Sequence, residues 1–276
     1  MRTVFAVIPA AQAAARAAEA FQALPHIADA KLVGLHVSPL TISYGIAGDI
    51  GVASFIEAQI AAADQEREEA EAAFAQACRQ SGIAFEWRAE RSPDAIVSAH
   101  AGSAARAADV ILAPQFADDA SLGRHQLEEL VFASGRPVIA LPKEWKATPL
   151  AVRVLVAWDG GREATRAIFD ALPLLTHAEA VKIVSVQGLL DDPVRQFTPG
   201  DDIAATLSRH GVPAETTSVR GSRGSVQEEL ETQALDFGAT LIVMGCYGHS
   251  RFRERVLGGV SRGMLTKVPY PLLLSN

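Results

Sequence analysis

The chain is poor in cysteine, and no stretch of it is apolar for long. Its 276 residues include only Cys78 and Cys246, which lie far apart and form no Cys-x-x-Cys pair. Neither a disulfide framework nor a zinc site is indicated. No apolar run reaches the ~18 residues of a membrane-spanning helix. The short apolar run at residues 3–9 is typical of a first β-strand rather than a signal peptide. We therefore expect a cytoplasmic protein with no membrane partner.

The chain also lacks an overall excess of basic residues. Its net charge is −7, on a composition that is 49% hydrophobic and 21% charged, as in ordinary soluble globular proteins. Residues 1–146 carry 12 Lys and Arg against 18 Asp and Glu, whereas residues 147–276 carry 13 against 14. The acidic half is unsuited to a polyanion, so we expect no nucleic-acid partner.

Familiar catalytic motifs are missing. The sequence contains no G-x-x-x-x-G-K-[ST], no H-E-x-x-H and no G-x-S-x-G, and its seven histidines do not cluster at metal-ligand spacing. We therefore assign no catalytic residue and no metal held by the protein itself.

Short aliphatic runs recur in the same order in the two halves. Each run is nearly continuous rather than alternating, which is typical of parallel strands buried on both faces. The matching runs are residues 3–9 and 153–159, 31–37 and 181–187, 85–88 and 215–220, 109–114 and 240–245, and 136–141 and 270–274. Helical patterns follow the first run of each half, at residues 12–24 and 162–175. This alternation predicts an α/β protein with two doubly wound, five-stranded parallel sheets. A charged linker with flanking prolines, residues 143–149, divides it into domains 1–146 and 147–276.

The longest predicted helix runs from about Ser54 to Gln80. Apolar residues recur along it at three- and four-residue steps, interrupted by Arg67; they are Ile56, Ile60, Ala63, Ala70, Phe74 and Ala77. One interpretation is a helix that covers the sheet. The other is a stripe that binds a partner.

The segment from Val243 to Val260 carries most of the functional information. An apolar run ends in Gly245 and Gly248, a basic loop follows, and Gly258 and Gly259 open a predicted helix that ends near Lys267. A strand that leads through glycines to a helix N-terminus presents bare N–H groups to a phosphate. In a doubly wound sheet, this loop and the turn after Trp158 meet where the strand order reverses.

The G-x2-G-x9-G spacing of this segment resembles the nucleotide loop of the universal stress protein family. Residues 154–164 are similar to the first strand and Asp-bearing turn of that family, and residues 268–274 to its final strand. The resemblance covers the chain as a tandem of two such domains, although only the second keeps the loop. It implies strand order 3-2-1-4-5 in each half, and dimeric packing through the last strands, either between the halves or between chains.

The resemblance also implies roles for individual residues. Asp159 would contact the nucleoside, or alternatively cap the following helix. Ala157 and Val186 would line the base and sugar pocket, or simply pack at strand ends. The phosphates would bind Gly245, Gly248, Gly258, Gly259 and the N–H of Val260. Among the loop side chains His249, Arg251, Arg253 and Arg255, the best placed is Arg251.

The loop departs from the family pattern at one position. Gly259 stands where the family has Ser or Thr after its third glycine. The loss of one hydroxyl contact costs on the order of 1 kcal/mol, which weakens binding without abolishing it. Cys246, inside the loop, is either an inert small residue or a thiol whose pKa the nearby arginines lower.

The first half lacks this apparatus. Pro9 to Gln12 replace the Asp-bearing turn, and residues 114–124 contain no glycine pair and two acids. The leading hypothesis is therefore a stress-response module that binds ATP, or a related adenine nucleotide with Mg²⁺ on its phosphates, in the second half only. Any hydrolysis would be slow because no positioned base is evident. The alternatives are an interaction scaffold with a vestigial loop and an enzyme on the same scaffold.

Overall fold

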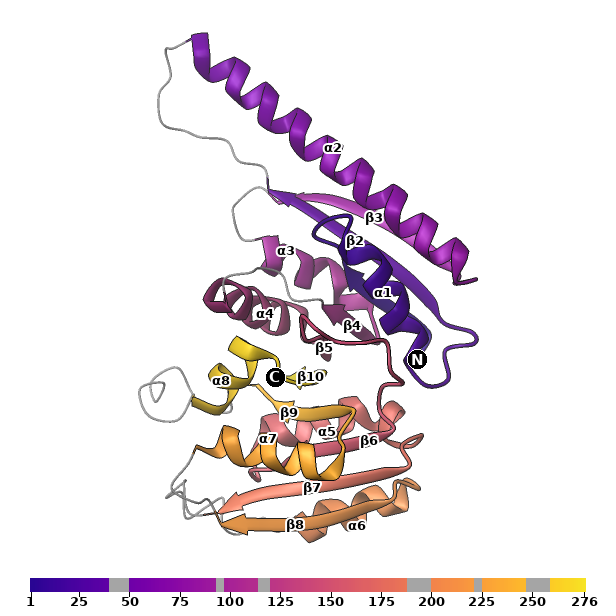
Figure 1. Cartoon of the computed structure of the whole chain (residues 1–276), viewed down its shortest axis with the longest axis vertical. Helices are drawn as coiled ribbons and strands as arrows, with labels where there is room; N and C mark the ends of the chain where they lie inside the picture. The colour runs from indigo at the N-terminus through magenta and orange to yellow at the C-terminus, as the bar shows by residue number, and fades with distance from the viewer. Residues whose placement is uncertain (40–49, 93–96, 114–119, 188–199, 221–224, 247–258) are drawn as a thin grey trace.

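The computed structural model describes residues 1–39, 50–92, 97–113, 120–187, 200–220, 225–246 and 259–276. In these ranges one sheet is covered by helices on both faces (Figure 1). The strands are β1 (Thr3–Val7), β2 (Lys31–Pro39), β3 (Phe85–Ser92), β4 (Val110–Ala113), β5 (Val138–Ala140), β6 (Arg153–Ala157), β7 (Ala180–Gln187), β8 (Ala214–Arg220), β9 (Leu241–Gly245) and β10 (Leu272–Ser275). The helices are α1 (Ala13–Gln22), α2 (Ile50–Gln80), α3 (Val97–Ala104), the short 3-10 helix η1 (Ala105–Ala107), α4 (Ala120–Ser134), α5 (Arg162–Leu175), α6 (Gly200–Arg209), α7 (Val226–Phe237) and α8 (Gly259–Lys267).

The predicted strand order is confirmed in both halves. The sheet reads β3-β2-β1-β4-β5-β10-β9-β6-β7-β8, so each half has the order 3-2-1-4-5 with parallel neighbours. The last strands of the halves, β5 and β10, pair antiparallel, with Leu272 opposite Ala140 and Leu274 opposite Val138. The two five-stranded sets are therefore joined into one ten-stranded sheet. The sequence left open whether these edges pair within one chain or between chains, and here they pair within it.

Alternate residues of each strand face different helical layers. Val4 and Ala6 pack in a core cluster with α1, α2, α5 and α6, whereas Phe5 and Val7 pack in a second cluster with α3, α4, α7 and α8. Each cluster contains residues of both halves, because β5 and β10 contribute to both. The near-continuous apolar runs of the sequence follow from this burial on two faces.

The central strands of the two halves are held at their starts in the same way. In the first half, Oδ2 of Asp109 accepts the N–H groups of Arg2 and Thr3 at 2.6 and 3.0 Å. In the second half, Oγ1 of Thr240 accepts those of Val152 and Arg153 at 3.0 and 3.2 Å. A carboxylate and a hydroxyl thus occupy equivalent places in the repeat.

Helix α2 covers the sheet with only part of its length. Ala70, Phe74 and Cys78 are fully buried, and Phe74 lies against Gly34 of β2. Towards its N-terminus the helix extends past the end of the sheet (Figure 1). The first interpretation of this helix therefore holds for its C-terminal part only. Among the described helices, none is long and apolar enough to cross a membrane.

Candidate functional site

The carboxyl ends of β6, β7 and β9 bring several predicted site residues to one edge of the sheet. Ala157 pairs with Val184, and the N–H of Trp158 donates to the Val184 carbonyl at 2.9 Å. Continuing this register sets Asp159 level with Val186. On the other side, Val156 pairs with Val243, two residues before Gly245. The strand order reverses between β6 and β9, where α/β sheets bind their ligands.

A partly buried apolar rim lies at this edge, on the face covered by α7 and α8. Ala157, Val186 and Val260 all pack against the same core cluster, as do Val219 and Val226. The sequence motifs did not point to the last two residues. Val219 could have been found from its place at the carboxyl end of β8, because it pairs directly with Val186.

Asp159 orders the turn between β6 and α5. Its Oδ1 accepts the N–H of Gly161 at 2.8 Å, and Gly160 has a φ of 74°. The N-cap of α5 is Gly161 rather than Asp159, so the interpretation of Asp159 as the helix cap is wrong by two residues. The side chain is exposed at the strand tip.

Gly245 has a packing reason to be glycine. A Cβ at this position would lie 2.5 Å from the backbone nitrogen of Ala164 and 2.5 Å from the carbonyl carbon of Glu163. Both atoms belong to the first turn of α5, on the face of the sheet opposite the apolar rim. The absence of a side chain at Gly245 thus brings the N-terminus of α5 close to the end of β9.

The glycine-rich loop is described only at its two ends. Gly248, Arg251 and Gly258 lie outside the described residues, as do the loop residues His249, Arg253 and Arg255. The helix after the loop runs from Gly259 to Lys267, as the sequence predicts. Val260, in its first turn, is partly exposed.

Cys246 is buried at the start of this loop, in contact with the end of the chain. Its N–H donates to the Ser275 carbonyl at 2.8 Å, and its carbonyl accepts Nδ2 of Asn276 at 2.6 Å. Burial raises the pKa of the Cys246 thiol, and the carboxylate of Glu128 raises it further. Burial and the raised pKa favour the interpretation of Cys246 as an inert small residue over that of an activated thiol.

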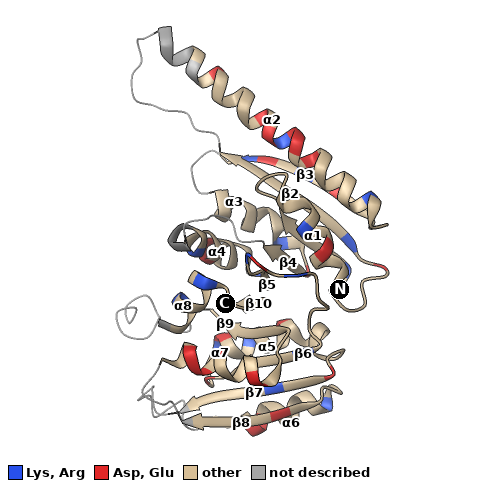
Figure 2. Cartoon of the chain, in the orientation of Figure 1, with Lys and Arg blue, Asp and Glu red and all other residues tan. Residues whose placement is uncertain are grey.

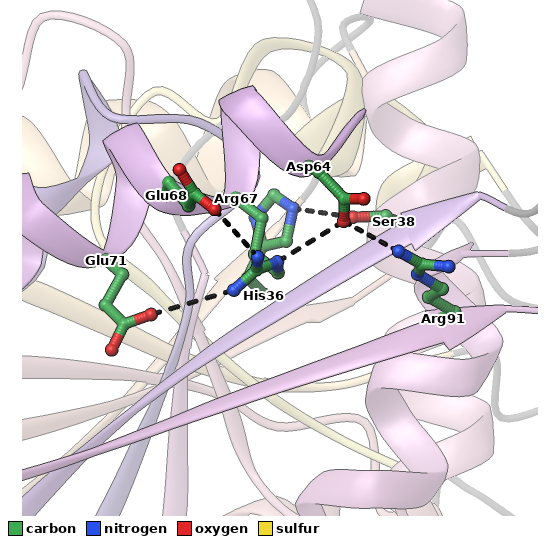
Figure 3. Close-up of polar contacts among 7 residues, drawn as sticks. All are labelled: His36, Ser38, Asp64, Arg67, Glu68, Glu71 and Arg91. Carbon is green, nitrogen blue, oxygen red and sulfur yellow. Dashed lines mark hydrogen bonds and ion pairs between the residues drawn. The ribbon is translucent and has the colours of Figure 1, made fainter. Parts of the chain in front are cut away.

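The corresponding edge of the first half carries a buried polar network on the face covered by α1 and α2, opposite to the face of the apolar rim. Nδ1 of His36 donates to the Ile8 carbonyl at 2.8 Å, and Nε2 lies 2.9 Å from Oγ of Ser38. His36 and Ser38 are 2% and 6% exposed, so both ring nitrogens are satisfied inside the protein. Above them, Arg67 of α2 pairs with Asp64, Glu68 and Glu71 (Figure 3). The ring of His36 thus occupies the place beside the end of β1.

A shallow pocket lies at the opposite, amino-terminal ends of the strands. It has a volume of about 240 Å³ and is lined where the halves meet, by residues that include Leu24, Leu150, His177 and Glu179. None of the predicted site residues lines it. Within the described ranges, His, Cys, Asp and Glu side chains form no group of three suited to a metal ion.

Comparison with protein families finds one match, in the second half. Residues 152–275 match the model of the Universal stress protein family. The second half of this chain is a universal stress protein domain. Comparison with the curated proteins gives no match.

Solved structures resemble the fold of the whole chain. A universal stress protein from Archaeoglobus fulgidus superimposes with a TM-score of 0.69 at 19% identity, covering 99% of this chain and 96% of its own. A putative universal stress protein from Pseudomonas aeruginosa does so with a TM-score of 0.57 at 15% identity, covering 100% of this chain and 93% of its own. At these identities the likeness concerns the fold, and it extends to the first half.

Proposed function

We propose that this chain is a stress-response module that binds ATP, or a related adenine nucleotide, in its universal stress protein domain. The observation that carries the proposal is the convergence of Ala157, Asp159 and Val186 at the edge where the strand order reverses, beside the end of β9. In such sheets ligands bind at the switch point. In this proposal, residues 147–276 form the domain that holds the site. The chain then acts as a binding protein rather than an enzyme.

In this proposal the apolar rim holds the base and ribose. Ala157 and Val186, together with Val219, supply partly exposed aliphatic surface, and Asp159 supplies a carboxylate that accepts a hydrogen bond from the nucleoside. The phosphates bind at the start of α8, on the N–H groups of Gly259 and Val260, with Gly248, Gly258 and Arg251 of the loop. Gly245 acts indirectly, by letting α5 approach. Mg²⁺ is carried on the phosphates.

Equilibrium dialysis of ATP against the intact chain tests this function. We expect one nucleotide per chain, because the first half has Pro9 to Gln12 in place of the Asp-bearing turn and no glycine pair in residues 114–124. Asp159→Ala should weaken binding about tenfold, the equivalent of losing one good hydrogen bond. Asp29→Ala, an exposed carboxylate in the first half, is the matched control and should leave affinity unchanged. Failure of the folded protein to bind ATP at millimolar concentration would remove the proposal.

A second candidate is favoured by one observation. Gly245 is explained by the packing of α5 alone, so at least this glycine needs no ligand to account for it. In that case the protein is an interaction scaffold whose nucleotide loop is vestigial. Gly259→Ser discriminates between the two: if the natural chain binds no ATP and this variant does, the loop is a relic. If both bind, with the variant tighter, the first proposal stands.

A further inference from the structure

The pocket at the amino-terminal ends of the strands is built from both halves of the chain. Its lining comes from the end of α1, the segment that leads into β6 and the turn before β7; the residues are 22–25, 149–152, His177 and Glu179. The N–H of Leu150 joins two of these segments by donating to the Ala23 carbonyl at 2.8 Å. The walls are therefore held together without a ligand, as is usual for small-molecule sites.

The hydrogen-bonding groups that the pocket offers to a ligand are mainly acceptors. Most backbone N–H groups in the lining already donate within the chain, namely those of Ala23, Leu24, Leu150, Val152, His177 and Glu179. Pro25 and Pro149 have no N–H to donate. The side-chain nitrogen of Gln22 donates to the Ser81 carbonyl at 3.2 Å, which leaves the side-chain oxygen of Gln22 as an acceptor.

The imidazole of His177 adds another acceptor. Its Nδ1 lies 3.0 Å from the Pro173 carbonyl, and because a carbonyl oxygen only accepts, Nδ1 donates in this hydrogen bond. Nε2 of the neutral ring then keeps its lone pair. The ring of His26, from the first half, lies against the ring of His177 with the two centroids 3.9 Å apart.

The lining is acidic and otherwise largely aliphatic. Figure 2 distinguishes the acidic and basic residues of the chain; among those that line the pocket, Glu179 is the only acidic residue and none is Lys or Arg. Within the described part of the chain, the exposed carboxylate of Glu179 has no hydrogen bond or ion pair. Leu24, Leu150 and Ala151 supply apolar surface at the base. A ligand that fits brings N–H donors, positive charge and a small apolar surface.

We propose that this pocket binds a small primary amine in its ammonium form, carried on a compact aliphatic body. The ammonium group pairs with the carboxylate of Glu179, and Nε2 of His177 and Oε1 of Gln22 are the further acceptors. The body lies against Leu24 and Leu150. The pocket volume of about 240 Å³ limits the ligand to about eight non-hydrogen atoms, at the ~30 Å³ that one water occupies in the liquid.

This site is separate from the proposed nucleotide site, because the two lie at opposite ends of the strands. Since its lining joins the first half to the second, a bound amine also adds contacts across their junction. Its occupancy should be the same with and without saturating ATP.

Titration of the intact, isotope-labelled chain with cyclohexylammonium, followed by NMR, tests the site. Cyclohexanol and cyclohexanecarboxylate keep the ring but replace the ammonium with a neutral and a negative group. We expect saturable shifts of the backbone amide signals of Leu150, Ala151 and His177, with a dissociation constant of about 1 mM for the ammonium. Cyclohexanol should bind at least about tenfold more weakly, and the carboxylate should not bind. Shifts that do not saturate, or equal binding of the three probes, would overturn the proposal.

Two variants test the roles of the lining side chains. Glu179→Gln keeps the shape of the side chain without its charge and should raise the dissociation constant at least about tenfold. His177→Phe keeps a ring against His26 without Nε2 and should raise it about three- to tenfold. Glu215→Gln, at an exposed carboxylate of β8 outside the lining, is the matched control and should leave it unchanged. Circular dichroism spectra like that of the wild type establish that the variants are folded. Wild-type affinity in a folded Glu179→Gln variant contradicts the assignment.

Discussion

Packing alone requires a glycine at position 245 of this chain. Gly245 falls in the loop motif, where a phosphate role is the natural prediction, yet its immediate contact is the backbone of α5. The sequence reveals that a side chain is absent at this position but not which neighbour requires the space. That neighbour comes from the fold, and in this case it lies on the face away from the apolar rim.

Gly245→Ala should therefore destabilise the protein even without ligand. The added Cβ would lie 2.5 Å from two backbone atoms that have no flexible end to move aside. We expect a loss of about 1–3 kcal/mol in the free energy of unfolding, as for other overpacked sites, measured by urea denaturation. Gly200→Ala is the control, because its Cβ would meet its nearest atom, in Thr216, at 3.5 Å, an ordinary contact. Equal stability of both variants would contradict this account.

Asp109 and Thr240 accept equivalent backbone hydrogen bonds in the two halves, but only the carboxylate can change its charge with pH. Burial opposes ionisation of Asp109, but the N–H groups of Arg2 and Thr3 outweigh it, so its pKa is lowered. A lowered carboxyl pKa contributes stability that is present above its unfolded value, about 3.9, and is lost as the pH falls through the folded value. The contribution of the Thr240 hydroxyl should not vary with pH.

Asp109→Ala should consequently cost about 1.5–3 kcal/mol of unfolding free energy at neutral pH, the range for hydrogen bonds to a charged group. The difference in unfolding free energy between this variant and the wild type should become smaller below about pH 4. Thr240→Val should cost less, with a gap that stays constant over the same range. Denaturant titrations at several pH values measure both. An Asp109→Ala gap that does not change with pH would show that the carboxylate's charge is unimportant there.

At the scale of elements, the sequence predicts most strands and helices because their chemistry is local. Helix α5 runs from Arg162 to Leu175 as expected, and α8 starts at the predicted Gly259. The alignment of the two halves by sequence was less reliable. The N–H of Ile8 donates to the Leu35 carbonyl, and the N–H of Trp158 donates to the Val184 carbonyl, so Leu35 and Val184 are structurally equivalent. This equivalence shifts β2 against β7 by one residue from the alignment of 31–37 with 181–187. Aliphatic runs identify a strand, but their uniformity leaves its register unspecified.

Helix α2 should show two different stabilities along its length. Residues 70–78 are anchored by Phe74, which contacts Phe85 and Trp87 at ring-centroid distances of 5.9 and 5.5 Å. Residues 56–63 have no such contacts within the described chain. Amide hydrogen exchange should be slow in the first segment and fast in the second. Uniform protection along the helix would mean that the N-terminal part is held by contacts other than those described.

For the whole molecule, the decisive feature is the antiparallel pairing of β5 with β10. The sequence predicts two similar halves but does not determine how they meet, because equal edges pair equally well within a chain and between chains. In this chain the edges pair within one molecule. The end of the linker is held against the first half, because the N–H of Leu150 donates to the Ala23 carbonyl at 2.8 Å. Both core clusters then span the halves.

This shared core predicts that the halves unfold together. Leu273 of β10 is 1% exposed and lies in the cluster that also contains Ile139 and Val4. Leu273→Ala should cost about 2–5 kcal/mol and lower a single calorimetric transition. Phe169→Ala, at an apolar side chain that is 43% exposed, should cost much less. Two separate transitions in the wild type would show that each half unfolds independently.

Because β5 and β10 pair antiparallel, the strand direction reverses at the centre of the sheet. Five strands, β1, β4, β5, β10 and β9, separate β2, which carries His36 and Ser38, from β6, which ends at Ala157. A small molecule seated at one edge is out of reach of the other. Any influence of such a molecule on the long helix above the first half has to travel through the shared strands and cores, and occupancy at one end leaves the surface at the other end free for a different contact.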